Sequence, residues 1–123
     1  MMPPTQHGPP PRSPHIYEEA DHLEDAFADD MRFLDRDMVE ETIINGRDYP
    51  KEGGPGKMRR KYEYDGVDVV VVIDPKVPCI ITAWTEINST SRALASSRWT
   101  TDDLQTIRAF MDKLHKRPGT WQV

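Results

Sequence analysis

Basic residues gather in one short stretch of an otherwise acidic chain. Four of the five residues from 57 to 61 are Lys or Arg, whereas the 123-residue chain has a formal net charge of −5. Arg and Lys bind phosphate through charge-assisted hydrogen bonds. Strand alternation divides this stretch between two faces, with Arg60, Tyr62 and Tyr64 on one and Lys57, Arg59 and Lys61 on the other. Either face could bind phosphate, or the charges could instead prevent a sheet edge from pairing with another chain.

Histidine would complete the chemistry that such a basic surface supports. Metal-independent cleavage of RNA needs a base near the ribose 2′-OH, an acid near the leaving oxygen and cations around the phosphate. The imidazole group suits both proton transfers because its pKa lies near neutrality. His22 lies beside Leu23 at the edge of an apolar stripe, so it is either a buried, hydrogen-bonded residue or an acid/base group.

The sequence lacks the motifs of several other classes of catalytic site. The sequence contains no Gly-x-Ser-x-Gly elbow, no His-x-x-x-His or Cys-x-x-Cys pair and no dinucleotide-binding glycine pattern. The aliphatic neighbours of Cys79 would raise its pKa and make it a poor nucleophile. We therefore expect no cofactor and no metal.

Length and composition limit the class of protein. A chain of 123 residues is expected to form one domain with one ordinary core. The single cysteine excludes an internal disulfide and a zinc site of several cysteines, and it fits a reducing cytoplasm. No apolar run approaches the roughly 20 residues that span a bilayer, so we expect a cytoplasmic protein with no membrane contact.

Three consecutive strands are predicted between residues 57 and 87. Asp65-Gly66 is a hairpin signal, and Asp74-Pro75 begins a second turn. The middle strand, Val67–Ile73, is apolar on both faces, so it should lie at the centre of a sheet that is covered on both sides.

Helices are predicted on either side of these strands. A stripe of apolar residues predicts a first helix over 16–33, and Asp35 or Asp37 can cap a second helix that ends at Asn45-Gly46. Residues 47–56 and 88–97 are expected to be loops. A final helix over 102–115 has an acidic first turn and a basic last turn, which both complement the helix dipole.

This order of elements predicts an α+β fold. Two N-terminal helices, a curved antiparallel sheet of at least three strands and a C-terminal helix should form a single domain over residues 15–117. Residues 1–14 are rich in proline and are expected to be a disordered tail, and residues 118–123 a short C-terminal tail.

A family resemblance adds to this interpretation. The segments that carry it are His22, 32–39, 42–46, Arg60-Lys61-Tyr62, Gly66, 69–73 and 80–84. Together they resemble small domains of uncharacterised function related to RelE, colicin D and barnase toxins, over about residues 18–87. The resemblance implies a toxin-like, metal-independent ribonuclease with an RNA substrate and an antitoxin or immunity protein as partner. It implies catalytic roles for His22, Arg60 and Thr82, and RNA contacts from Arg59, Lys61, Tyr62, Thr85 and Arg92.

Two further hypotheses stay open. A catalytically inactive member of the same fold would act as a protein-interaction module, with the acidic helix face and the strand edge as docking surfaces. A structural or assembly protein would use its Pro-rich arm. One spatial test separates the ribonuclease hypothesis from these two. A ribonuclease requires His22 to line one cleft together with a cation, which could be Arg59, Arg60, Lys61 or Arg92.

Overall fold

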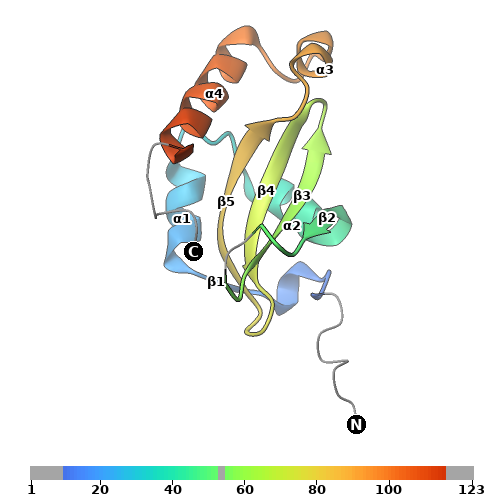
Figure 1. Ribbon diagram of the computed structural model, residues 1–123, viewed down its shortest axis with the longest axis vertical. Helices are drawn as coiled ribbons and strands as arrows, with labels where there is room; N and C mark the ends of the chain where they lie inside the picture. Colours follow the sequence, from blue (N-terminus) through green and yellow to red (C-terminus); the bar gives the residue numbers. More distant parts are fainter. Residues whose placement is uncertain (1–9, 53–54, 116–123) are drawn as a thin grey trace.

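The protein has the expected α+β architecture (Figure 1). The computed structural model describes residues 10–52 and 55–115. Its elements are η2 (Pro14–Ile16), β1 (Glu18–Glu19), α1 (Asp21–Ala28), α2 (Arg36–Asn45), β2 (Arg47–Tyr49), β3 (Met58–Tyr64), β4 (Val67–Asp74), β5 (Cys79–Ile87), α3 (Thr90–Ala95) and α4 (Thr101–His115). Residues 1–9 of the predicted N-terminal tail and the whole predicted C-terminal tail, 118–123, lie outside the described residues.

The sheet has five strands in the order β1-β5-β4-β3-β2. Its centre is the predicted three-strand meander of β3, β4 and β5, which pair antiparallel. The expected antiparallel sheet of at least three strands is confirmed, and the short strand β1 makes the whole sheet mixed because it pairs parallel with β5. The strand β2 was expected to be part of a loop, and it adds an antiparallel edge beside β3.

The turn between β3 and β4 follows the sequence signal. Asp65 and Gly66 have φ angles of +48° and +92°, the left-handed conformation that a tight hairpin requires at both central positions. Gly66 also lies so close to the chain that an added Cβ would be 2.5 Å from both Ser89 O and Ala93 N. Glycine is therefore needed here both for its backbone conformation and for its size.

Each face of the central strand β4 packs in a separate apolar cluster, as predicted. Val69, Val71 and Ile73 face α1 and α2, in a cluster that also contains Leu23 and Ile43. On the opposite face, Val70 and Val72 pack with Trp84 of β5 and Phe110 of α4. In Figure 1, α4 runs along β5, whereas α2 lies behind the sheet.

The helix α2 agrees with the prediction, whereas the first helix is shorter than predicted and α3 lies in a predicted loop. The side chain of Asp35 accepts a hydrogen bond from Met38 N, and α2 ends at Asn45, as expected. The predicted first helix over 16–33 is too long, because Glu18 and Glu19 are paired with β5 and only Asp21–Ala28 is helical. The predicted loop 88–97 contains α3, which Ser89 caps by accepting from Arg92 N.

The N-terminal boundary also differs from the expected one. Tyr17 Oη donates to Pro11 O at 2.5 Å, and Arg12 Nη1 donates to Gly46 O at 2.8 Å, at the end of α2. Pro10 to Pro14 were assigned to the disordered tail, but these contacts attach them to the domain. We refer to residues 10–17 as the N-terminal arm.

Candidate functional site

Arg60 is held inside the protein. Its side chain is 0% exposed, and the guanidinium is bonded at every nitrogen. Nε donates to Asp48 Oδ1 at 2.5 Å, and Nη2 donates to Asp48 Oδ2 at 3.3 Å. The backbone oxygens of Ile43, Pro11 and Pro10 accept the remaining bonds at 2.7, 3.0 and 3.2 Å. Because these partners use its donors, Arg60 joins β3, β2, α2 and the N-terminal arm, and it leaves no guanidinium face for a substrate phosphate.

Thr82 and Thr85 of β5 both bind Arg32. Thr82 Oγ1 accepts from Arg32 Nη1 at 3.1 Å, and Thr85 Oγ1 donates to Arg32 O at 2.6 Å. Their side chains lie on opposite faces of the sheet, since Thr82 is paired with Val72 and Thr85 with Val69. Both threonines are buried, so their hydroxyl groups fix the segment after α1 to the sheet.

His22 is exposed on α1. Among the described residues, no hydrogen bond or salt bridge involves its imidazole. The neighbouring Leu23 is fully buried and packs with Val69 and Val71. The helix therefore lies on the face of the sheet opposite Arg59 and Lys61, the two cations of β3 that have some exposure.

The other proposed RNA contacts are also dispersed. Tyr62 lies on the α2 face of β3 and contacts Tyr64 edge to face, with 5.2 Å between the ring centroids. Arg92 lies on α3 at the end of the sheet and forms a salt bridge to Glu63 at 2.8 Å. Lys61 forms a salt bridge to Glu52 at 2.9 Å, and its ammonium lies over the Tyr49 ring.

The structure therefore does not bring the predicted catalytic set together. His22, Arg60 and Thr82 belong to three separate environments, which are solvent, a buried ion pair and a contact between β5 and the segment after α1. None of the three lines the pocket described below. Within the described ranges, no group of three or more His, Cys, Asp or Glu side chains is placed to hold a metal ion.

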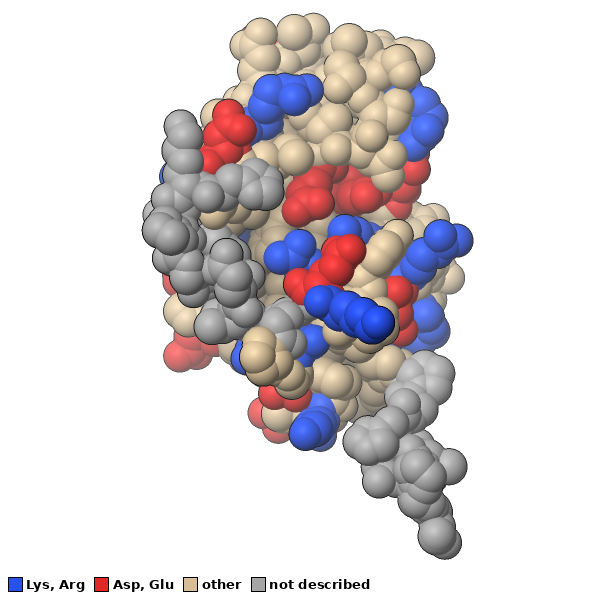
Figure 2. Space-filling model, viewed as in Figure 1, with Lys and Arg blue, Asp and Glu red and all other residues tan. Residues whose placement is uncertain are grey.

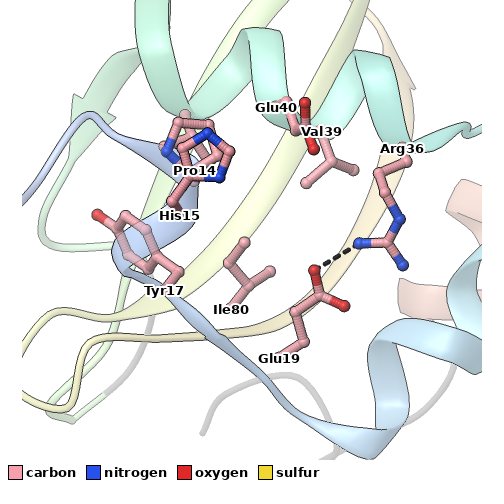
Figure 3. Close-up of a pocket in the computed structure, with 9 residues that line it drawn as sticks. Pro14, His15, Tyr17, Glu19, Arg36, Val39, Glu40 and Ile80 are labelled. Atoms are coloured by element: carbon pink, nitrogen blue, oxygen red, sulfur yellow. Dashed lines mark hydrogen bonds and ion pairs between the residues drawn. The ribbon is translucent and has the colours of Figure 1, made fainter.

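A pocket lies where the N-terminal arm crosses α2 and β5 (Figure 3). Its volume is about 240 Å³. Buried side chains of the arm, α2 and β5 form its apolar floor, namely Tyr17, Val39, Ile43 and Ile80. Polar side chains surround this floor, namely His15, Glu19, Arg36 and Glu40. We call this cavity the arm pocket.

The charges around the arm pocket are mainly negative. Among the described residues that line the pocket, Arg36 is the one Lys or Arg. The guanidinium of Arg36 already donates a hydrogen bond to the carboxylate of Glu19. Arg36 also approaches Glu24 at 3.5 Å and stacks over Phe27. Glu40 forms no salt bridge among the described residues, so its carboxylate is available to a cationic group.

Tyr17 connects the arm pocket to the buried arginine. Its ring lines the pocket, and its hydroxyl donates to Pro11 O, which also accepts from Arg60. Burial raises the pKa of Tyr17 above its ordinary value, and the nearby Arg60 opposes this shift. The phenol is therefore neutral over the physiological range and acts as a hydrogen-bond donor.

No sequence signal predicts this pocket. Its lining comes from residues 14–19, 36–43 and Ile80, which are far apart in the chain, and no motif connects them. Asp48 was also missed, because it stands in a segment of Gly, Pro and charged residues that resembles a loop.

Comparison with known proteins adds no assignment to this geometry. Protein-family models, curated proteins and solved structures all gave no match to the chain. Across the described residues, no helix has the length and apolar character needed to cross a bilayer.

Proposed function

We propose that this protein is a non-catalytic interaction module that binds a basic segment of a partner protein at the arm pocket. The observation that carries the proposal is the composition of the pocket, an apolar floor beside the carboxylate of Glu40, which forms no salt bridge to another described residue. A lysine or arginine side chain matches this arrangement, because its hydrocarbon stem packs on apolar surface while its charged head stays at the rim.

The surroundings of the pocket favour a cationic partner. Exposed acidic residues lie on β1 and α2, which contribute to the pocket lining, and on α1, which follows β1 in the chain, namely Glu18, Glu19, Asp21, Glu24, Asp25 and Asp37. Their combined field would attract a basic segment and increase its association rate, more strongly at low ionic strength. The same field would repel the phosphates of RNA.

The placement of the candidate catalytic residues supports the non-catalytic part of the proposal. A ribonuclease of the expected type needs an acid/base group and a cation at one phosphate. His22 is exposed on α1, and Arg60 is buried with its donors occupied. The resemblance to toxin ribonucleases remains a hypothesis, and the three residues to which it gives catalytic roles do not form one site in the described part of the chain.

A peptide titration tests the binding proposal. The probe is a fluorescein-labelled peptide of alternating leucine and lysine, and its partner probe has glutamate in place of every lysine. We expect the full-length protein to bind only the lysine peptide, with an affinity that falls as salt is added. Glu40→Lys should weaken binding about tenfold or more, since a repulsive charge replaces an attractive one.

A matched variant separates local from general electrostatics. Asp112 is exposed on α4, which is not among the elements that line the arm pocket. Asp112→Lys changes the net charge by the same amount as Glu40→Lys, so it should leave the affinity nearly unchanged. Equal weakening by both variants, or equal binding of both peptides, would show that the pocket does not select a basic segment.

An RNA digestion tests the non-catalytic assignment separately. Labelled RNA is incubated with the protein in EDTA, and the wild type is compared with His22→Ala and Arg60→Ala. We expect no cleavage by any of the three. Cleavage by the wild type that is lost in His22→Ala would establish the ribonuclease and refute our assignment. Loss of cleavage in Arg60→Ala alone would not distinguish a catalytic defect from unfolding, because the buried Arg60 side chain also holds the fold together.

A further inference from the structure

Two exposed isoleucines adjoin the arm pocket. Ile16 stands between His15 and Tyr17, which both line the pocket. Ile44 directly follows Ile43, another lining residue. A single apolar side chain on a surface needs no explanation, but two beside one cavity indicate a surface that a partner covers. The large hydrophobic side chains that are exposed in the described part of the chain are Ile16, Ile44, Val77 and Leu94.

Ile44 extends the rim of the pocket along α2. It lies four residues after Glu40, and residues at this spacing are neighbours on the surface of a helix, with about 5–6 Å between their Cβ atoms. Arg12 Nη1 donates to Ile44 O at 3.2 Å, so the N-terminal arm passes α2 at this level. Ile44 is 43% exposed, which leaves its side chain open to contact.

Ile16 lies at the same end of the pocket as Ile44. In Figure 3, Arg36 stands at one end of the pocket, and His15 and Tyr17 stand at the other. Ile16, which is 54% exposed, stands between these last two residues in the arm. Ile44 belongs to the last turn of α2, away from Arg36. The two isoleucines therefore extend the arm pocket at the end where the arm meets α2.

We propose that the arm pocket selects an extended partner segment in which an apolar residue stands two positions from the cation. This inference rests on the proposed function, because it takes the cation to lie at Glu40. Residues two apart in an extended chain project from the same side, about 6.7 Å from each other. That spacing is close to the one between Glu40 and Ile44. A lysine at Glu40 therefore places the apolar side chain over Ile44 and beside Ile16.

The alternation of an extended chain decides which partner residues matter. Successive side chains point to opposite sides, so the residue next to the cation points away from α2 and is free to vary. An apolar residue one position further covers Ile44, and the removal of both apolar surfaces from water favours the complex. A serine at that position gains little from Ile44. The cavity of about 240 Å³ holds one long side chain, so the partner needs one cation with an apolar residue at the right spacing.

Isomeric peptides test the spacing. The first probe has the core Leu-Ser-Lys-Ser-Leu, the second has Ser-Leu-Lys-Leu-Ser, and the third has Ser-Ser-Lys-Ser-Ser, each with fluorescein on an N-terminal Gly-Gly linker. The cores are symmetric, so the direction of the bound chain does not affect the result. In anisotropy titrations with the full-length protein, we expect the first probe to bind at least about fivefold more tightly than the other two.

Substitution of the isoleucines locates the contact. Ile44→Ser should reduce the affinity of the first probe to that of the third, and it should leave the third unchanged, because only the first probe covers Ile44. Ile16→Ser should also weaken the first probe alone, and it supplies a second measurement if Ile44→Ser does not fold. Circular dichroism checks the folding of each variant.

A matched control stands on α3. Leu94 is 52% exposed, and the segment Thr90–Ala95 contains no acidic residue. Figure 2 shows largely uncharged surface at the top of the view, where α3 lies in Figure 1. Leu94→Ser should therefore leave the affinities of all three probes unchanged. An equal effect of Leu94→Ser and Ile44→Ser would show unspecific apolar binding and would overturn the inference.

The remaining outcomes separate this inference from the proposed function. Equal affinities of the three probes, each tighter than the same core with glutamate in place of lysine, would refute the spacing and leave the proposed function standing. If no lysine probe bound more tightly than its glutamate counterpart, both would fail together.

Two other occupants of the surface are tested directly. A helix of about 15 alanine-rich residues can present lysine and leucine four positions apart, at about the same separation. Tighter binding of that helix than of the first probe would refute the extended geometry. Sedimentation velocity of the wild type alone tests for a second copy of the chain. A dimer that dissociates in Ile44→Ser would assign the isoleucines to self-association and overturn the inference.

Discussion

Removal of the Asp48 carboxylate should destabilise this protein severely. Asp48→Ala leaves Arg60 charged and fully buried, with the backbone oxygens of Pro10, Pro11 and Ile43 as its remaining partners among the described residues. Breaking a buried ion pair by removing one partner costs about 3–5 kcal/mol, because the other charge stays in a poorly solvated site. The side chain of Asp48 is 21% exposed, so water can reach the vacated position. We therefore expect a cost near the lower end, about 3 kcal/mol.

That cost is large for a domain of this size. Domains usually unfold with a free energy of about 5–15 kcal/mol. For a domain of about 100 residues, each kcal/mol lowers the melting temperature by about 4–8 °C. Asp48→Ala should therefore lower it by more than about 10 °C. Thermal and urea unfolding, followed by far-ultraviolet circular dichroism, measure both quantities.

Two matched variants isolate the buried charge as the cause. Glu19→Ala breaks the salt bridge to Arg36, whose side chains are 41% and 46% exposed, so it should cost less than about 1 kcal/mol. The double variant Asp48→Leu with Arg60→Met removes both charges, and it should be more stable than Asp48→Ala. If Asp48→Ala cost no more than Glu19→Ala, or if the double variant were the less stable one, the reasoning about the buried arginine would be refuted.

Three other predictions follow from single residues. Gly66→Ala should cost about 2–4 kcal/mol, because a positive φ is combined with backbone atoms 2.5 Å from the new Cβ. Urea unfolding measures this cost. Asp68→Asn should flatten the dependence of stability on pH. Burial raises the pKa of Asp68 above 3.8 in the folded chain, so its contribution is present below pH 3.8 and is lost as the pH rises through the folded-state pKa. Urea midpoints measured across this range test the sign. Cys79 should react slowly with iodoacetamide at neutral pH and faster above about pH 9, because burial raises the thiol pKa above its ordinary value of 9.0. Mass spectrometry of the intact chain gives the rate.

Each of these three predictions would be contradicted by one specific measurement. Gly56 also has a positive φ, but its Cβ would meet nothing within 4 Å. Gly56→Ala should therefore cost only about 1 kcal/mol, and equal costs at the two glycines would contradict the steric argument. A steeper pH dependence in Asp68→Asn would reverse the expected sign. Reaction of Cys79 at the rate of a free thiol would show that the side chain is not shielded.

The sequence determined the parts of this fold that depend on neighbouring residues. Asp65-Gly66 specifies the hairpin because its conformation is local, and Asp35 and Asn45-Gly46 set the limits of α2 for the same reason. Alternation along Val67–Asp74 predicted which valines share a face, because the side-chain period of a strand is two. The α+β class followed from the order of these elements.

Tertiary structure decided the roles of the charged residues. The sequence shows that Arg59 and Arg60 point to opposite faces of a strand. It does not show that Asp48 and three backbone oxygens enclose Arg60, or that Nε of Arg59 has no acceptor among the described residues. It also cannot show that β1 pairs with β5 and thereby shortens the first helix. Burial and ion pairing depend on segments that are distant in the chain, so the difference between a phosphate-binding arginine and a structural one is set only when those segments pack together.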